Sequence, residues 1–280
     1  MYGVNSMVWK KSNTILQLSR TLIPLFLCAA LAGCAGKPWT VPLEGDRYKE
    51  TSRLMETLAE SDAACGKTLD GDLSLVYTNA LEKKALAGYL EFSMPTSYKF
   101  VVTNPFGQPV FAAAGDHTSY QAIHVPERIY MAGGMLSFGL RHNLPVEILS
   151  RSWGEWIMDR NTRSSQAITA IHEDRQARGI WITYRHEEGE PAGRSHLLVD
   201  PAGGIILARI LENGEGKQVA EVTYDDWQNQ EKCRQPQAVN ITGLDYGTDI
   251  RLKLANVRIT EEKKRFQLPV PPGYMKQLMP

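Results

Sequence analysis

Histidine, cysteine and acidic side chains are the residues of this chain that could carry chemistry. The six histidines show neither the H-x-H nor the H-x-x-x-H spacing with which two imidazoles bind one metal ion. No Cys-x-x-Cys pair, G-x-S-x-G nucleophile motif or phosphate-binding glycine loop accompanies them. The acidic pairs Glu187-Glu188 and Asp225-Asp226 lie in or beside predicted loops, where solvation accounts for them. We therefore expect neither an enzyme nor a metal site, although scattered residues could still meet in space.

Lipidation of Cys34 is the chemistry that the sequence does predict. A leader with three basic residues precedes an apolar run, residues 21–32, that is too short to span a bilayer and ends in small residues. This pattern is typical of a secretory signal. The closing Leu31-Ala32-Gly33-Cys34 resembles the lipobox of bacterial lipoproteins, in which the cysteine receives a diacylglyceryl group, the signal is cut before it, and the new amine is acylated. The alternative is an ordinary cleavage site that happens to contain a cysteine.

The lipobox resemblance implies a signal peptide over residues 1–33 and a lipidated tether over residues 34–45, with the lipid on Cys34 in place of any cofactor. Ala35 is not the aspartate that such proteins use for retention in the inner membrane, so the resemblance implies the periplasmic face of the outer membrane. Cleavage removes three basic and no acidic residues from a chain of net charge zero. The slightly acidic product argues against nucleic acid as a partner.

Besides Cys34, two cysteines, Cys65 and Cys233, follow the predicted cleavage site, whereas Cys28 leaves with the signal. In an oxidising periplasm such a pair favours a disulfide, here between the start of the domain and its late strands. Two separate buried thiols are the alternative, because the sequence does not give the distance between them.

The elements that would position these residues are mostly strands. A helix is predicted over Asp46–Glu60, and from Thr68 onward the apolar period becomes two. Short turn-rich loops join the strands, so neighbours run antiparallel. A helical stripe interrupts them after Pro145. The sequence predicts a mainly β (α+β) domain of about ten or eleven strands over residues 46–260, followed by a proline-rich tail over residues 261–280.

One predicted hairpin carries a large apolar residue at its turn. Tyr98–Thr103 and Val110–Ala114 both alternate with period two, and Asn104-Pro105-Phe106-Gly107 between them is a turn signal. Turns are usually polar, so the position of Phe106 calls for an explanation.

Three segments, in this order, resemble the LolB-like outer-membrane lipoproteins of the LolA/LolB half-open β-barrel superfamily. They are YKFVVTNPFGQPVF, LPVEILSRSWGEWI and AVNITGLDYGTDIRLKL, and the resemblance covers roughly Arg47 to Ile259. It implies a strongly curved, unclosed antiparallel β-barrel with covering helices and an apolar cavity. The tail after Thr260, Cys65 and Cys233 depart from the family pattern.

The resemblance implies a protein that binds the acyl chains of lipoproteins or lipids and helps insert or localise them in the inner leaflet of the outer membrane. It allows a periplasmic lipoprotein carrier as a further partner. The T-N-P-x-G match assigns Asn104, Pro105, Phe106 and Gly107 to the loop that touches the membrane. An exposed phenylalanine gains about 1.5–3 kcal/mol on entering an apolar environment, which would bias a tethered protein towards the bilayer.

The candidates for the cavity wall and its lid are apolar residues of the early strands and the middle helix. They are Leu86, Leu90, Phe92, Phe100, Val102, Trp153 and Trp156. Each assignment has an alternative: these residues could form a packed core, and Phe106 could fold back onto the domain. The corresponding alternative function is a non-catalytic structural or interaction subunit of an envelope complex on the same fold.

Overall fold

The dominant feature of the computed structural model is one large β-sheet. Residues 37–141, 156–161, 167–185, 193–230 and 233–279 are described. Trp39–Pro280 is one compact unit. Most of the helix that the sequence predicts after Pro145 lies outside the described residues, as does the predicted signal peptide.

The described part of the chain contains two helices, α2 (Gly45–Ala63) and α3 (Met135–Arg141), and a 3-10 turn at Asp245–Gly247. The strands are β1 (Trp39–Pro42), β2 (Thr68–Thr78), β3 (Lys83–Ser93), β4 (Ser97–Thr103), β5 (Pro109–Gly115), β6 (Ser119–His124), β7 (Ile129–Gly134), β8 (Ile168–Asp174), β9 (Ile180–Tyr184), β10 (Gly193–Asp200), β11 (Ile205–Asn213), β12 (Gln218–Gln230), β13 (Cys233–Leu244), β14 (Thr248–Thr260) and β15 (Met275–Leu278).

All fifteen strands belong to one unclosed sheet. Its order is β1-β8-β9-β10-β11-β12-β13-β14-β2-β3-β4-β5-β6-β7-β15, and β1 and β15 stand at its two ends. Neighbours pair antiparallel except β15, which runs parallel to β7. The mainly β, unclosed architecture is as predicted, but the sheet has more strands than the expected ten or eleven. Two of the additional strands, β1 and β15, lie in segments predicted to be a tether and an extended tail.

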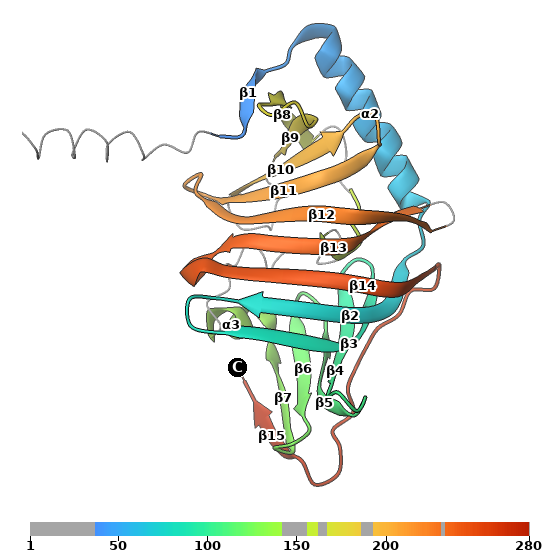
Figure 1. Cartoon of the computed structure of the whole chain (residues 1–280), viewed down its shortest axis with the longest axis vertical. Helices are drawn as coiled ribbons and strands as arrows, with labels where there is room; N and C mark the ends of the chain where they lie inside the picture. The colour runs from blue at the N-terminus through green and yellow to red at the C-terminus, as the bar shows by residue number, and fades with distance from the viewer. Residues whose placement is uncertain (1–36, 142–155, 162–166, 186–192, 231–232, 280) are drawn as a thin grey trace, which may run out of the picture. The chain divides into compact units, whose positions relative to one another are not determined.

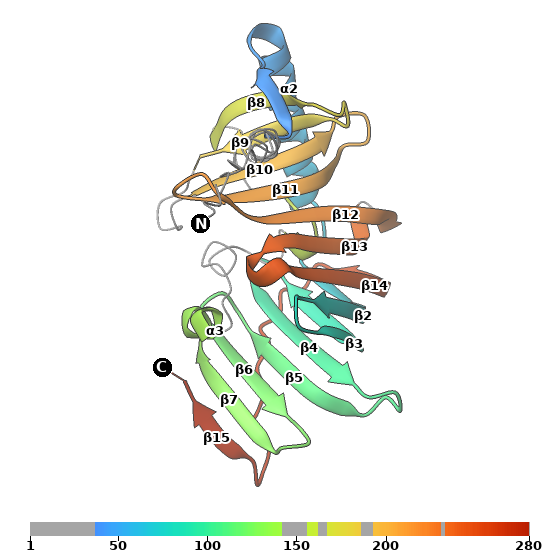
Figure 2. The same cartoon turned by 60° about the vertical axis from the view of Figure 1, so that its left-hand side comes forward.

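The sheet changes direction between β3 and β4. Gly88 on β3 pairs with Val102 on β4, and a Cβ atom at Gly88 would lie 1.9 Å from the carbonyl oxygen of Val101. Only glycine permits so close an approach of two backbones. In Figures 1 and 2, β4–β7 turn away from the direction of β2 and β3.

The sheet face that carries Leu90 and Phe92, here called the inner face, bears three buried apolar clusters. Met55 of α2 packs on β8–β13, Met158 packs on β2, β3 and β14, and Met135 of α3 packs on β5 and β6. The predicted helix at Asp46–Glu60 is confirmed as α2. The helix α3 was not predicted, because its seven residues are too few to show a periodic pattern.

The C-terminal segment crosses the opposite, outer face of the sheet. The backbone N–H of Phe266 donates to Ser97 Oγ (3.1 Å), and that of Leu268 donates to Gln121 Oε1 (2.6 Å). Leu268 packs in a buried cluster with Ala114. The segment then joins the edge of the sheet as β15, as Figure 2 shows.

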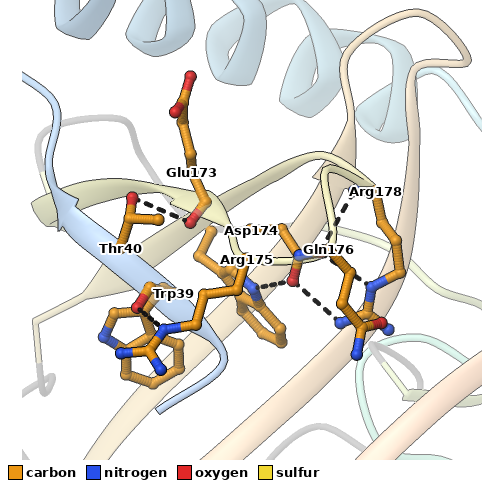
Figure 3. Close-up of polar contacts among 8 residues, drawn as sticks. Trp39, Thr40, Glu173, Asp174, Arg175, Gln176 and Arg178 are labelled. Carbon is orange, nitrogen blue, oxygen red and sulfur yellow. Dashed lines mark hydrogen bonds and ion pairs between the residues drawn. The ribbon is translucent and has the colours of Figure 1, made fainter. Parts of the chain in front are cut away.

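At the other end of the sheet, β1 is fixed by side-chain contacts as well as by its pairing with β8. The Trp39 ring stacks on His196 with 4.4 Å between ring centroids, on the outer face of β10. Figure 3 shows that Thr40 Oγ1 donates to the carbonyl oxygen of Glu173 (3.3 Å) and Arg175 Nε to that of Trp39 (3.1 Å).

The turn between β8 and β9 is organised by Asp174, whose side chain is fully buried. Its carboxylate accepts hydrogen bonds from Trp181 Nε1 (2.8 Å) and from Arg178 Nη2 (2.9 Å) and Nε (3.0 Å), as Figure 3 shows in part. Burial opposes ionisation, but the hydrogen bonds from Arg178 and Trp181 outweigh it and lower the pKa of Asp174 to about 2.

Candidate functional site

The turn between β4 and β5 holds its shape through one asparagine side chain. Asn104 Oδ1 accepts the backbone N–H groups of Phe106 (2.9 Å) and Gln108 (3.0 Å). The N–H of Gly107 donates to the carbonyl oxygen of Asn104 (2.9 Å), and Gly107 has φ +77°, a conformation that glycine adopts without strain. The tip is therefore a defined turn.

Phe106 at this tip is 88% exposed. It does not fold back onto the domain, which was the alternative left open by the sequence. Asn104, Pro105 and Gly107 shape the turn as the sequence suggested, and none of them covers the ring. The hairpin thus presents one large apolar side chain to its surroundings.

A second exposed apolar tip was not foreseen. Leu81, in the turn between β2 and β3, is 94% exposed. Asn79 Oδ1 accepts the backbone N–H groups of Leu81 and Glu82, both at 2.8 Å. The signal was present in the sequence, because TNALE, like TNPFG, places an asparagine two residues before the apolar tip.

Both tips lie at the same end of the strands β2–β5. The chain turns from β2 to β3 at residues 79–82 and from β4 to β5 at residues 104–108, whereas the turn from β3 to β4 lies at the other end of these strands. Ala87 pairs with Thr103, which places Leu86 beside the start of the Phe106 turn. This end of the strands therefore carries the exposed residues Leu81 and Phe106, and Leu86, beside the start of the Phe106 turn, is 38% exposed.

The residues proposed for a cavity wall share the inner face, as their alternation predicted. Leu90 pairs with Phe100, and Phe92 pairs with Tyr98. Phe92 and Leu90 are buried in one apolar cluster and Val102 is also buried, whereas Phe100 is half-buried. Part of the set is thus packed core and part of it is accessible.

The accessible part forms an apolar strip on β14, β2, β3, β4 and β5. Leu252 pairs with Leu75, and Leu75 pairs with Leu86. The rings of Phe100 and Phe111 lie 5.6 Å apart between centroids. All five are half-buried or exposed. We call these residues, Leu75, Leu86, Phe100, Phe111 and Leu252, the apolar strip.

Another part of the inner face is covered by the segment Trp156–Asn161, in which every residue is buried. Trp156 packs on the sheet, and Met158 is 0% exposed. Arg209 Nη2 holds the segment by donating to the carbonyl oxygen of Arg160 (2.9 Å). Over this region the inner face is a packed interior. Trp153 and Cys34 lie outside the described residues.

A buried carboxylate accompanies this segment. Asp159 Oδ1 lies 3.3 Å from Arg209 Nη2. Burial raises the pKa of Asp159 to about 7, although the nearby Arg209 guanidinium favours the ionised form. This pair joins residues 50 positions apart, so periodicity gave no sign of it.

Cys65 and Cys233 form a disulfide with 5.6 Å between their Cα atoms. It links the end of α2 to the start of β13, as the sequence predicted. Within the described ranges there is no group of three or more His, Cys, Asp or Glu residues that could hold a metal ion. In the same part of the chain, no helix is long and apolar enough to cross a bilayer.

No family model and no curated protein sequence matches this chain. Among solved structures, a DUF1329 family protein from Desulfovibrio piger aligns with a TM-score of 0.55 and 9% identity, over 77% of this chain and 94% of that protein. This likeness shows a shared fold.

Two further solved structures align less closely. A putative outer membrane lipoprotein-sorting protein domain from Vibrio parahaemolyticus has a TM-score of 0.49 and 8% identity, over 76% of this chain and 93% of that one. A LolA superfamily protein from Nitrosomonas europaea has a TM-score of 0.46 and 11% identity, over 78% and 94%. The unclosed curved sheet with helices on its inner face agrees with the architecture that the sequence resemblance implied, and the chain shares its fold with the DUF1329 family protein.

Proposed function

We propose that this protein is a non-catalytic lipoprotein, anchored through a lipid on Cys34 at the periplasmic face of the outer membrane. It binds acyl chains of lipoproteins or lipids on its inner face and helps to place them in that membrane. The observation that supports this most directly is the apolar strip, which runs to the end of the strands where Phe106 and Leu81 are exposed. Transfer of an acyl chain from the protein to a bilayer needs an apolar surface that binds the chain next to apolar residues that touch the membrane.

The strip has the chemistry that an acyl chain requires. Each methylene removed from water contributes about 0.8 kcal/mol. Leu75, Phe100 and Phe111 leave apolar surface accessible, so a chain lying along them would be partly desolvated. Because the segment Trp156–Asn161 covers the neighbouring part of the inner face, we place the acyl chain on the strip and not in a hollow running through the whole fold.

A pair of variants on one strand tests this placement. Leu75 and Val76 are neighbours on β2, so their side chains point to opposite faces of the sheet. In the lipid-free mature chain Ala35–Pro280, which contains the whole compact unit, Leu75→Lys should abolish the uptake of a fluorescent fatty acyl probe, whereas Val76→Lys should leave it intact. Absence of uptake by the parent chain, or equal loss in both variants while both remain folded, would count against acyl binding.

The packed segment Trp156–Asn161 favours a second candidate, a structural or interaction subunit of an envelope complex. In that case Phe106 would be a protein contact. Affinity purification of the lipidated protein would then recover a stoichiometric partner that Phe106→Glu loses, and the acyl probe would not bind.

A further inference from the structure

The C-terminal segment brings a further exposed apolar residue to the end of the strands where Phe106 lies. Residues 266–279, here called the C-terminal strap, cross the outer face and join the sheet as β15. Met275, the first residue of β15, pairs with Ile129 at the start of β7. Its backbone N–H donates to the carbonyl oxygen of Arg128 (2.9 Å), and the residue is 57% exposed. Met275 is therefore an accessible apolar residue at a fixed position.

The register of the sheet places Met275 and the Phe106 hairpin at the same end of their strands. β5 begins directly after the Phe106 turn, and the carbonyl oxygen of Val110 near its start accepts the backbone N–H of Val125 (3.0 Å). Residues 125–128 form the turn into β7, against whose first residue Met275 lies. Figure 2 shows the β4–β5 hairpin, the β6–β7 turn and the start of β15 at one end of these strands. Three strand spacings, about 14 Å, separate β5 from β15.

The turn that leads into β15 has few backbone N–H groups to desolvate. Pro271 and Pro272 have no N–H group, and the N–H of Tyr274 donates to the carbonyl oxygen of Pro271 (3.3 Å). In the Phe106 turn, the Asn104 side chain accepts two backbone N–H groups. Because a buried N–H without a partner is costly, turns of this kind can enter an apolar or interfacial environment at low cost.

The spacing of the two tips suits a bilayer better than a protein partner. Phe106 and Met275 are separated by the β6–β7 turn, which exposes Glu127 and Arg128. A stable protein interface buries about 800 Å² of continuous surface on each partner. A bilayer needs no such continuity, because separate apolar side chains insert into it while charged neighbours stay among the head groups.

We infer that the C-terminal strap supplies a further point of contact with the membrane, through Met275. The inference rests on the membrane contact proposed for Phe106 and extends that contact across β5, β6 and β7. Leu81 and Phe106 mark the contact on one side of β5, and the strap lengthens it by three strand spacings on the other. The tail that departs from the family pattern thereby takes part in the function.

Co-sedimentation of the mature chain Ala35–Pro280 with vesicles of phosphatidylethanolamine and phosphatidylglycerol tests the contact. Full burial of a methionine side chain is worth about ten- to 150-fold in a binding constant. Because Met275 is 57% exposed, Met275→Ala should weaken binding about three- to tenfold. Its loss should multiply with that of Phe106→Ala in the double variant, since the two residues lie on separate elements.

Leu278→Ala is the matched control. Leu278 is 77% exposed on the same strand, but it pairs with Ala132 towards the other end of β7. Its replacement should therefore change vesicle binding by less than twofold, although it removes more exposed apolar surface than Met275→Ala does. A melting temperature for each variant shows that it is folded.

A fluorescent label shows whether the contact is direct. Cys65 and Cys233 form the disulfide, so Met275→Cys and Leu278→Cys each give the mature chain one free thiol for an environment-sensitive fluorophore. When vesicles are added, the emission of the label at position 275 should shift to shorter wavelength, and that of the label at position 278 should not.

The inference is overturned if Met275→Ala binds vesicles within twofold of the parent chain, if Leu278→Ala loses as much as Met275→Ala, or if the label at position 275 does not respond to vesicles. If Phe106→Ala still loses binding in such a case, the hairpin contact remains without the strap. A parent chain that does not bind vesicles overturns both contacts, whereas uptake of the acyl probe tests acyl binding separately.

Discussion

Removing the ring of Phe106 should release the protein from membranes without changing its stability. The side chain is 88% exposed, so almost all of its apolar surface is available for transfer to a bilayer. Transfer of a phenylalanine side chain is worth about 1.5–3 kcal/mol, and each 1.4 kcal/mol is about tenfold in a binding constant. Phe106→Ala should therefore weaken binding to vesicles by about ten- to 150-fold.

The assay is co-sedimentation of the mature chain Ala35–Pro280 with vesicles of phosphatidylethanolamine and phosphatidylglycerol, over a range of lipid concentrations. Leu81→Ala should also weaken binding, because Leu81 lies at the same end of the strands β2–β5 as Phe106. Val41→Ala is the matched control, since Val41 is 78% exposed but belongs to β1 at the far end of the strand order. Phe106→Trp should retain binding.

A Phe106→Ala protein that binds vesicles within twofold of the parent chain would refute this reasoning. Equal losses in the Phe106 and Val41 variants would also refute it, because they would mean that any exposed apolar residue serves. Urea unfolding of each variant shows whether the substitution has changed stability. Because all three side chains are exposed, we expect no change.

Three further predictions concern stability. Asp174→Asn should lower the free energy of unfolding by about 2 kcal/mol at pH 7, because the folded-state pKa of Asp174, about 2, lies below its unfolded value of 3.8. The stabilisation by Asp174 is present above pH 4 and is lost towards pH 2. Urea unfolding that gives the same difference between variant and parent at pH 7 and pH 2.5 would contradict this prediction. Phe92→Ala should cost about 3–5 kcal/mol in the same assay, and Leu86→Ala on the same strand below 1 kcal/mol, because Phe92 is 0% and Leu86 38% exposed. Replacing Cys65 and Cys233 together by alanine should cost about 3–5 kcal/mol, because their disulfide closes a loop of 168 residues; an unchanged unfolding midpoint would contradict this.

Local periodicity was sufficient for the part of the fold where burial alternates along a strand. The alternation over residues 86–94 and 98–102 predicted the inner-face register of Leu90 and Phe100, and the turn signal at Asn104 predicted the hairpin. The helix α2 was predicted because its apolar residues recur every three or four positions.

The missed features depend on contacts between distant parts of the chain. The strand β1 has only four residues, three of which are exposed, and it is held by the stacking of Trp39 on His196. The carboxylate of Asp159 contacts Arg209 of β11, which is 50 positions away in the sequence. Burial of Arg160 has the same origin. Propensity and periodicity contain no information about such contacts.

The pairing of β1 with β8 shortens the flexible tether through which a lipid on Cys34 would hold the domain. If the chain were free up to residue 44, its reach would be about 35 Å, whereas only residues 35–38 precede β1, a reach of about 15 Å. The Phe106 hairpin follows β4, ten strand spacings from β1, or up to about 48 Å along the sheet. A protein tethered so closely at one end can touch the bilayer with the other only when the strand stack lies along the membrane, so the anchor would dictate orientation as well as location.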